Sequence, residues 1–287
     1  MRNEKFALFA AALLLTALSA RSLAAQEDPT VAAMTAPAEA PEGDQGDQPV
    51  HRDPLGARLI NLPTAFPVRS HALEVMFLHR FQQAVQDGDS HNLWGLDSGA
   101  DVGLGIAWGI SPRLDVALLR SSFQEDYELS GKALVVEQSP RMPLSAAVRL
   151  GVDRLGRAGA VDPTRPFGQV ILSRRLAPGF NLLLAPSWVR DTERLRNAWN
   201  IPVGLTVGLP HGGLLEIEVI PKNHDLDGSL TAWHLALSKQ VGGHIFQFVL
   251  GNSRATTVDQ YLGGDFAGGF RTRDVRLGFN LIRDFDF

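Results

Sequence analysis

The feature that most constrains the fold of this chain is an alternation of apolar with small or polar residues, with a period of two. In residues 198–209 the odd positions are Trp, Ile, Val, Leu, Val and Leu, whereas the even positions are Ala, Asn, Pro, Gly, Thr and Gly. Residues 101–110 and 144–153 alternate in the same way. Because successive side chains of a strand point to opposite faces of a sheet, each segment predicts a strand with one apolar face.

The alternation recurs along most of the chain and predicts about twelve antiparallel strands. Most of these segments have the ~9–11 residues that a tilted strand needs to cross a bilayer, whereas strands of soluble proteins usually have ~5–6. Short turns alternate with long polar connections, which is typical of outer-membrane barrels. The sequence therefore predicts an all-β fold, a transmembrane antiparallel up-and-down β-barrel with both termini on the periplasmic side. The predicted strands lie near residues 72–81, 100–110, 113–122, 127–137, 143–152, 167–176, 180–189, 198–209, 213–220, 230–239, 244–251 and 274–287.

Two prolines and several aromatic residues occupy special places in these strands. Pro186 and Pro202 fall inside predicted strands, where each removes a hydrogen-bond donor, so we expect bulges there, toward the outer rim. Aromatic residues are expected to form a girdle at each membrane interface. Those at predicted external strand ends are Trp188, Trp199 and Trp233, and those at periplasmic ends are Trp108, Phe180, Phe285 and Phe287.

The first 25 residues have the pattern of an export signal. Arg2 and Lys5 precede an almost unbroken apolar stretch over residues 6–18, and Ser22-Leu23-Ala24 is a small-x-small cleavage motif. The apolar stretch is shorter than the ~20 residues of a membrane-anchoring helix. We therefore predict export and cleavage near Ala24 or Ala25.

Residues 26–71 divide into an arm and a second, more apolar segment. Residues 26–53 contain four prolines, six acidic residues before residue 53 and no aromatic residue. Such a composition buries too little apolar surface to offset the entropy of ordering, which predicts a disordered acidic linker. A solvated linker is the default interpretation, and a tether for a periplasmic partner is the alternative. Residues 54–71 precede the barrel of residues 72–287, and their apolar part, residues 58–68, is a candidate plug for the bore.

Composition excludes several classes of function. The net charge is −4, so a basic surface for nucleic acid is not expected. The chain has no cysteine. It therefore has no disulfide, no thiolate metal site, no cysteine nucleophile and no lipoprotein anchor.

Five short motifs carry a resemblance to a known family. Their order along the chain resembles that of an uncharacterised bacterial family of predicted outer-membrane β-barrels, which is known only as a domain of unknown function. The resemblance covers roughly residue 58 to the C-terminus and implies a barrel in the outer membrane, with no established activity, substrate or catalytic residue. The motifs are residues 58–65 (RLINLPTA), 79–81 (HRF), 92–100 (NLWGLDSGA), 242–247 (GGHIFQ) and 277–281 (LGFNL).

The sequence offers little evidence of catalysis. It contains no Gly-x-Ser-x-Gly elbow, no His-Glu-x-x-His and no P-loop. His234 lies on the polar face of a predicted strand, and a general base there would need an adjacent serine and a carboxylate. Residues 223–228 place oxygen-bearing side chains as in a calcium loop, but the first position is Asn and the twelfth is His234 instead of Glu. We therefore predict no enzyme, no cofactor and no metal.

By the same alternation, a set of charged and polar side chains should face the lumen. Mixed signs are compatible with a wet channel or with a lumen closed by internal ion pairs. At the C-terminus, Leu281, Phe285 and Phe287 resemble the signal that outer-membrane assembly machinery reads. The predicted lumen-lining residues are Glu74, Arg80, Asp101, Asp115, Lys132, Arg149, Thr206, Glu216, Glu218, His234 and Arg276.

Three functions follow as hypotheses. The first is a monomeric, porin-like channel in the cell outer membrane, surrounded by outer-membrane lipid, that passes small solutes. The second is a non-conducting scaffold or surface-interaction barrel, which is favoured if internal charges pair and the N-terminal segment fills the bore. The third is a lipid hydrolase with its active site at the rim, which needs a His-Ser-carboxylate arrangement there.

Overall fold

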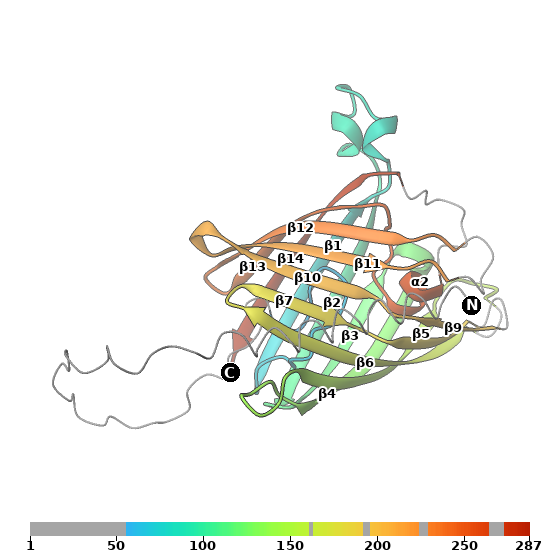
Figure 1. The fold of residues 1–287 in the computed structure, drawn as a ribbon. Helices are drawn as coiled ribbons and strands as arrows, with labels where there is room; N and C mark the ends of the chain where they lie inside the picture. The colour runs from blue at the N-terminus through green and yellow to red at the C-terminus, as the bar shows by residue number, and fades with distance from the viewer. Residues whose placement is uncertain (1–55, 161–162, 192–195, 224–228, 264–272) are drawn as a thin grey trace, which may run out of the picture. The chain divides into compact units, whose positions relative to one another are not determined.

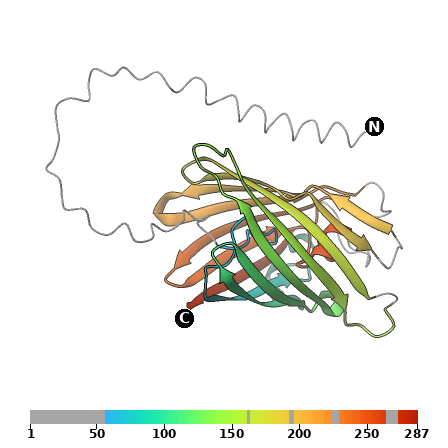
Figure 2. The ribbon, with the colours of Figure 1, turned by 90° about the horizontal axis from the view of Figure 1, so that it is seen from below.

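The computed structural model describes residues 56–160, 163–191, 196–223, 229–263 and 273–287. Within these residues one antiparallel sheet runs from β5 to β9, and pairing of β5 with β6 closes it into a barrel (Figure 1). The strands cross the barrel obliquely, which Figure 2 shows for the green and yellow strands. The segments are β1 (Ala72–Phe81), β2 (Ala100–Ser111), β3 (Leu114–Ser121), β4 (Asp126–Val136), β5 (Ser145–Leu155), β6 (Thr164–Ala177), β7 (Phe180–Leu184), β8 (Ser187–Asp191), β9 (Arg196–Asn200), β10 (Val203–Leu209), β11 (Gly213–Ile220), β12 (Ala232–Val241), β13 (His244–Gly251) and β14 (Arg276–Asp286).

These segments make twelve strands, which confirms the predicted fold class and number. Segments β7 and β8 both pair with β6, so they are two halves of one strand. Segments β9 and β10 are likewise two halves of the next strand, because they pair with β8 and β7. The strand ranges inferred from the alternation agree closely with the observed ones.

The two interruptions coincide with Pro186 and Pro202. The β6 pairings have the same register on both sides of Pro186, from Leu172↔Leu184 to Phe167↔Val189. Each proline lacks a donor but keeps its acceptor: the N–H of Val170 donates to the carbonyl of Pro186, and that of Ala185 to the carbonyl of Pro202, both at 2.9 Å. The prediction of bulges at these two prolines is therefore wrong. The pairing register continues past each proline, which is bound through its carbonyl. Register shifts lie instead near the opposite strand ends, at Gly109/Ser111, Leu134/Val136 and Arg175/Ala177.

The burial pattern of the barrel is opposite to that of a soluble protein. Buried charged residues alternate along the strands with exposed apolar ones, so the apolar face points outward, as a membrane barrel requires. Among the described residues no helix has the length and apolar character to cross a bilayer. Exposed apolar side chains of the strands include Leu104, Ile106, Leu118, Leu129, Leu150, Leu237, Phe246 and Phe248.

The two ends of the barrel differ in their connections. We call the end with the connections after β1, β5, β11 and β13 the loop end, and the opposite end, where the chain enters β1, the turn end. Aromatic pairs lie at both ends, with Trp188 and Trp199 rings 6.5 Å apart at the loop end and Trp108 and Phe287 rings 6.1 Å apart at the turn end. The short helices are η1 (Val85–Asp87), η2 (Leu93–Gly95), η3 (Phe123–Glu125), η4 (Pro210–Gly212) and α2 (Val258–Gly263).

Candidate functional site

All of the predicted lumen-lining residues are buried in the structure, each with at most 8% of its surface exposed. In the described part of the chain, other groups cover them. Two segments that are not strands fill the bore and contact this wall, one from each end of the barrel. Some of these residues bind other wall residues: the hydroxyl of Thr206 accepts a hydrogen bond from Asn181 at 2.8 Å, and Arg149 donates to Gln169 at 2.8 Å.

The first inserted segment is the N-terminal hairpin, residues 57–64. A bridge pairs Arg58 with Pro63, the N–H of Leu59 donates to the carbonyl of Leu62 at 2.8 Å, and that of Thr64 donates to the carbonyl of Ala57 at 3.0 Å. The hairpin tip therefore lies at residues 60–61. Because residues 65–71 lead from the hairpin to β1, it enters the bore through the turn end.

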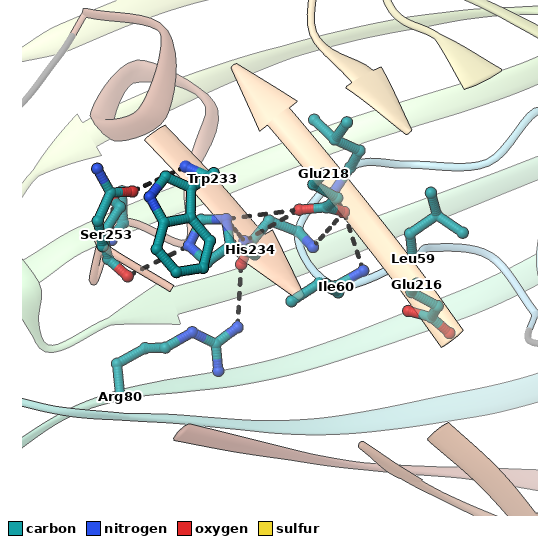
Figure 3. Close-up of polar contacts among 12 residues, drawn as sticks. Leu59, Ile60, Arg80, Glu216, Glu218, Trp233, His234 and Ser253 are labelled. Carbon is teal, nitrogen blue, oxygen red and sulfur yellow. Dashed lines mark hydrogen bonds and ion pairs between the residues drawn. The ribbon is translucent and has the colours of Figure 1, made fainter. Parts of the chain in front are cut away.

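The carboxylate of Glu218 holds the tip of the N-terminal hairpin. Its Oε1 accepts the backbone N–H groups of Ile60, Asn61 and Leu62 at 2.8–2.9 Å (Figure 3). Hydrogen bonds to an ionised carboxylate are the stronger kind, and burial away from water increases the penalty for breaking them. The backbone N–H groups of the hairpin turn thus bind the Glu218 carboxylate as an anion-binding site would bind an anion. Here the anion belongs to the same chain.

The side chain of Asn61 lies between three wall residues. Its Oδ1 accepts a hydrogen bond from Arg80 Nη2 at 3.1 Å, and its Nδ2 donates to Glu218 Oε2 at 3.2 Å. The same Nδ2 lies 3.2 Å from Nδ1 of His234. The wall residues Arg80, Glu218 and His234, which come from three different strands, therefore converge on one hairpin side chain.

Backbone carbonyls of the hairpin are bound by polar wall residues as well. Asn280 Nδ2 donates to the carbonyl of Ile60 at 3.2 Å, and Gln247 Nε2 donates to that of Leu59 at 3.3 Å. Gln247 also donates to Glu216 Oε2 at 2.9 Å, which brings another predicted lumen residue into the network.

Nearer the turn end, Lys132 and Asp115 hold the base of the N-terminal hairpin. Lys132 Nζ donates to the carbonyl oxygens of Ala57 at 2.9 Å and Phe66 at 2.7 Å, and it lies 3.5 Å from Asp115 Oδ2. The same Asp115 oxygen accepts the N–H of Val68 at 2.9 Å. Glu74 completes this region, because a Cβ on Gly56 would lie 3.3 Å from Glu74 Oε2.

The second inserted segment is the inserted loop, residues 252–263, which includes α2. Glu128 accepts the N–H of Val258 at 2.9 Å and pairs with Arg149, a predicted lumen residue. Tyr261 Oη accepts a hydrogen bond from Gln169 Nε2 at 3.0 Å, and burial raises the pKa of this hydroxyl. The remaining predicted residues, Asp101 and Arg276, contact the start of this loop through Arg254 Nη1 (2.7 Å) and the carbonyl of Asn252 (3.3 Å).

His234 is where the two inserted segments meet. Its Nε2 lies 3.2 Å from the carbonyl oxygen of Ser253 in the inserted loop, while Nδ1 faces Asn61 of the N-terminal hairpin. Because a carbonyl can only accept, Nε2 carries the proton and Nδ1 accepts from the amide. Both ring nitrogens are thus engaged in binding the two segments (Figure 3).

The inserted loop was not identified from the sequence, because residues 252–273 form one of the long polar connections between predicted strands, which were expected to be external. The missed wall residues are Asp126, Glu128, Asp153 and Arg165, and the missed loop residue is Asp259. A usable signal was present, because Val258, Tyr261 and Leu262 have helical spacing inside an otherwise polar stretch, and all three are buried.

Several sequence-based predictions lie elsewhere. The acidic arm, the cleavage site and most of the loop at residues 223–228 are outside the described residues. Of the assembly-signal residues, Leu281 and Phe285 lie on β14, and Phe287 is 82% exposed at the end of the chain.

The family model of the membrane-bound beta barrel domain DUF5777 matches residues 55–285. The chain belongs to this family. The matched residues include the N-terminal hairpin and the inserted loop as well as the strands. No curated protein matches the chain.

Solved barrel structures are similar to this family member in fold only. The NanC porin has a TM-score of 0.48 and 9% identity, covering 74% of this chain and 98% of the porin. An outer-membrane channel from Pseudomonas putida F1 has a TM-score of 0.45 and 14% identity, covering 82% and 100% of the two chains. Outer membrane phospholipase A from Escherichia coli has a TM-score of 0.44 and 12% identity, covering 77% and 94%.

Proposed function

We propose that this protein is a gated channel for small solutes in the bacterial outer membrane, and that the N-terminal hairpin is its gate. The filled bore and the paired internal charges, which by themselves favour the non-conducting scaffold, then describe the closed state of the channel. The proposal rests on which parts of the chain occupy the bore. In a permanently closed small barrel the wall's own side chains fill the interior. Here the wall is lined by charged and polar groups, and two segments from outside the strands occupy the space between them.

The contacts that hold the hairpin are of a kind that water can replace. Glu218, Lys132 and Asn280 bind backbone groups of the hairpin and its flank, so each wall residue would be hydrated if the hairpin left. A wall of apolar side chains would instead be exposed to water unfavourably on opening. These polar contacts thus suit a barrel that alternates between a bore filled by the hairpin and a bore filled by water.

The hairpin is also connected directly to a segment that a partner could bind. It is joined to the barrel through residues 65–71 alone, and the predicted acidic arm, residues 26–53, precedes it in the chain. A periplasmic partner that bound this arm would act directly on the gate.

An engineered disulfide tests the proposal, because the chain has no native cysteine. Ile60 of the hairpin shares an apolar cluster with Val249 of β13, so the double variant Ile60→Cys/Val249→Cys places one cysteine on the gate and one on the wall beside it. Single-channel current would be recorded in planar bilayers from residues 26–287. We expect discrete openings in the reduced double variant and none after oxidation, whereas the single variant Ile60→Cys is insensitive to the oxidant.

Silence of the wild type and of the reduced variant would contradict the proposal, provided that heat-dependent gel migration verifies folding. That result would favour a non-conducting scaffold. Openings that persist in the fully oxidised double variant would mean that the hairpin is not the gate.

A further inference from the structure

Three aspartates converge where the inserted loop meets the wall. Asp126 begins β4, Asp153 lies near the end of β5, and Asp259 lies on α2. One carboxylate oxygen from each lies within 4.8 Å of the others, and at most 2% of each residue is exposed. Carboxylates this close in a buried site repel each other unless a cation or protons neutralise them.

Two of the three carboxylates have an oxygen with no donor. Asp126 Oδ2 accepts from Thr257 Oγ1 at 2.6 Å, and Asp153 Oδ2 accepts the N–H of Asp259 at 3.0 Å. Oδ1 of Asp126 and Oδ1 of Asp153 are buried and have no hydrogen-bond partner among the described residues. A buried carboxylate oxygen without a partner is unfavourable, so two of them at adjacent positions require a neutralising group, either a proton or an additional ligand.

The charge balance of this region points to the same conclusion. Glu128 also contacts the inserted loop, so four carboxylates lie here. The ion pairs supply two guanidinium groups, Arg149 to Glu128 and Arg165 Nη1 to Asp259 Oδ2 at 2.6 Å. Among these groups the deficit is two positive charges, which one divalent cation or two protons would supply.

We propose that Asp126, Asp153 and Asp259 bind a divalent cation of the Ca²⁺ class. The donors are all oxygens, which hard cations prefer. Because Ca²⁺–oxygen distances are 2.3–2.6 Å, two ligands of one ion can be as far apart as about 5 Å, so these three oxygens fit around a single ion. The hydroxyl of Thr257, 3.0 Å from Asp259 Oδ1, is a further oxygen beside the site.

The cation would join α2 to two strands of the wall. Asp126 and Asp153 belong to β4 and β5, which are neighbours in the sheet, and Asp259 belongs to the segment that fills the bore. The ion would thus fasten the inserted loop at the loop end. This inference does not depend on conduction, because the site is formed whether or not the N-terminal hairpin moves.

Binding can be measured on the folded protein, residues 26–287 in detergent micelles, after EDTA treatment and removal of the chelator. Isothermal titration with CaCl₂ should give one ion per chain, and the temperature of heat-dependent gel migration should rise with Ca²⁺. Asp153→Asn is nearly isosteric and should weaken Ca²⁺ binding by about tenfold or more, because affinity follows the charge of the ligands. Glu74→Gln is the matched control, a buried wall acid on β1 near the turn end, and it should bind Ca²⁺ like the wild type.

If Asp153→Asn does not fold, Asp259→Asn provides the same test from α2, where no strand is altered. Absence of Ca²⁺ binding by the wild type at millimolar concentration would overturn the proposal and mean that protons neutralise the cluster. Unchanged affinity in the folded aspartate variant would also overturn it. Equal affinity for Mg²⁺ and Ca²⁺ would overturn the choice of cation class.

Discussion

Asn61 Nδ2 and His234 Nδ1 lie 3.2 Å apart although 173 residues separate them in the sequence. The other ring nitrogen of His234 donates to the carbonyl of Ser253. One imidazole therefore links the N-terminal hairpin with the inserted loop, and its orientation is fixed by both. A general base needs a free nitrogen facing a nucleophile, so this arrangement suits a structural junction.

The anchoring role of Glu218 can be tested by cysteine labelling. In an Ile60→Cys background, Glu218→Gln should raise the rate of labelling by a membrane-impermeant maleimide, because three backbone N–H groups lose an ionised acceptor. A loss of about 1.5–3 kcal/mol corresponds to a roughly 10- to 150-fold larger population with the hairpin released. Asp101→Asn, a wall acid that contacts Arg254 instead, is the control. Equal labelling rates in the two variants would show that Glu218 does not hold the hairpin.

The outward apolar face predicts a depth-dependent effect of charge. Leu150 lies in the middle of β5 and is 63% exposed, so Leu150→Arg should lower the free energy of unfolding by about 2–4 kcal/mol in lipid vesicles. Val241 ends β12 at the turn end and is 55% exposed, and Val241→Arg should cost only about 0–1 kcal/mol. Urea titrations of the two variants in the same vesicles provide the comparison. Similar losses would contradict the assignment of Leu150 to the lipid core.

The chain approaches β2 closely just before it enters β1. A Cβ on Gly109 would lie 1.9 Å from the carbonyl oxygen of Arg69, and that backbone cannot yield without displacing residues 68–71. Gly109→Ala should therefore destabilise the barrel by about 1–3 kcal/mol. At Gly131 the nearest atom to an added Cβ is 3.7 Å away, so Gly131→Ala should change stability by less than about 0.5 kcal/mol. Thermal unfolding followed by circular dichroism would distinguish them, and a neutral Gly109→Ala would argue against the close approach.

The predicted signal peptide has a direct test. We expect the protein recovered from outer membranes to begin at Ala25 or Gln26, because the small-x-small motif ends at Ala24. Intact-mass measurement of the purified protein gives the start site. A mass that includes residues 1–25 would refute cleavage, and substitution of Ala24 by Arg should leave the precursor uncleaved.

The strands of the barrel could be predicted because their information is local. Alternation within ten residues gave both the strand range and the side that each residue faces, as for Arg149 and Leu150 on β5. Pro186 and Pro202 misled the local argument, since the retained carbonyl of each proline keeps the strands in register. Whether the absent N–H of a proline disturbs the sheet depends on the neighbouring strand. The sequence of one strand does not specify that neighbour.

The filling of the bore could be predicted only in part. The apolar content and position of residues 58–68 indicated a segment able to enter the barrel. The partners of that segment could not be identified, because Glu218, His234 and Asn280 are brought together only by closure of the sheet. The aspartate cluster was missed for the same reason: Asp126, Asp153 and Asp259 are far apart in sequence, and no spacing relates them.

The long sequence separation of the hairpin contacts has a consequence for biogenesis. The N-terminal hairpin is synthesised and exported before any strand, yet the carbonyl of Ile60 is bound by Asn280, 220 residues later on β14, and that of Leu59 by Gln247 on β13. Its binding site is therefore incomplete until β13 and β14 are in place. A docked hairpin thus indicates that the barrel is complete, and a barrel arrested before β14 would have its first-made segment still outside.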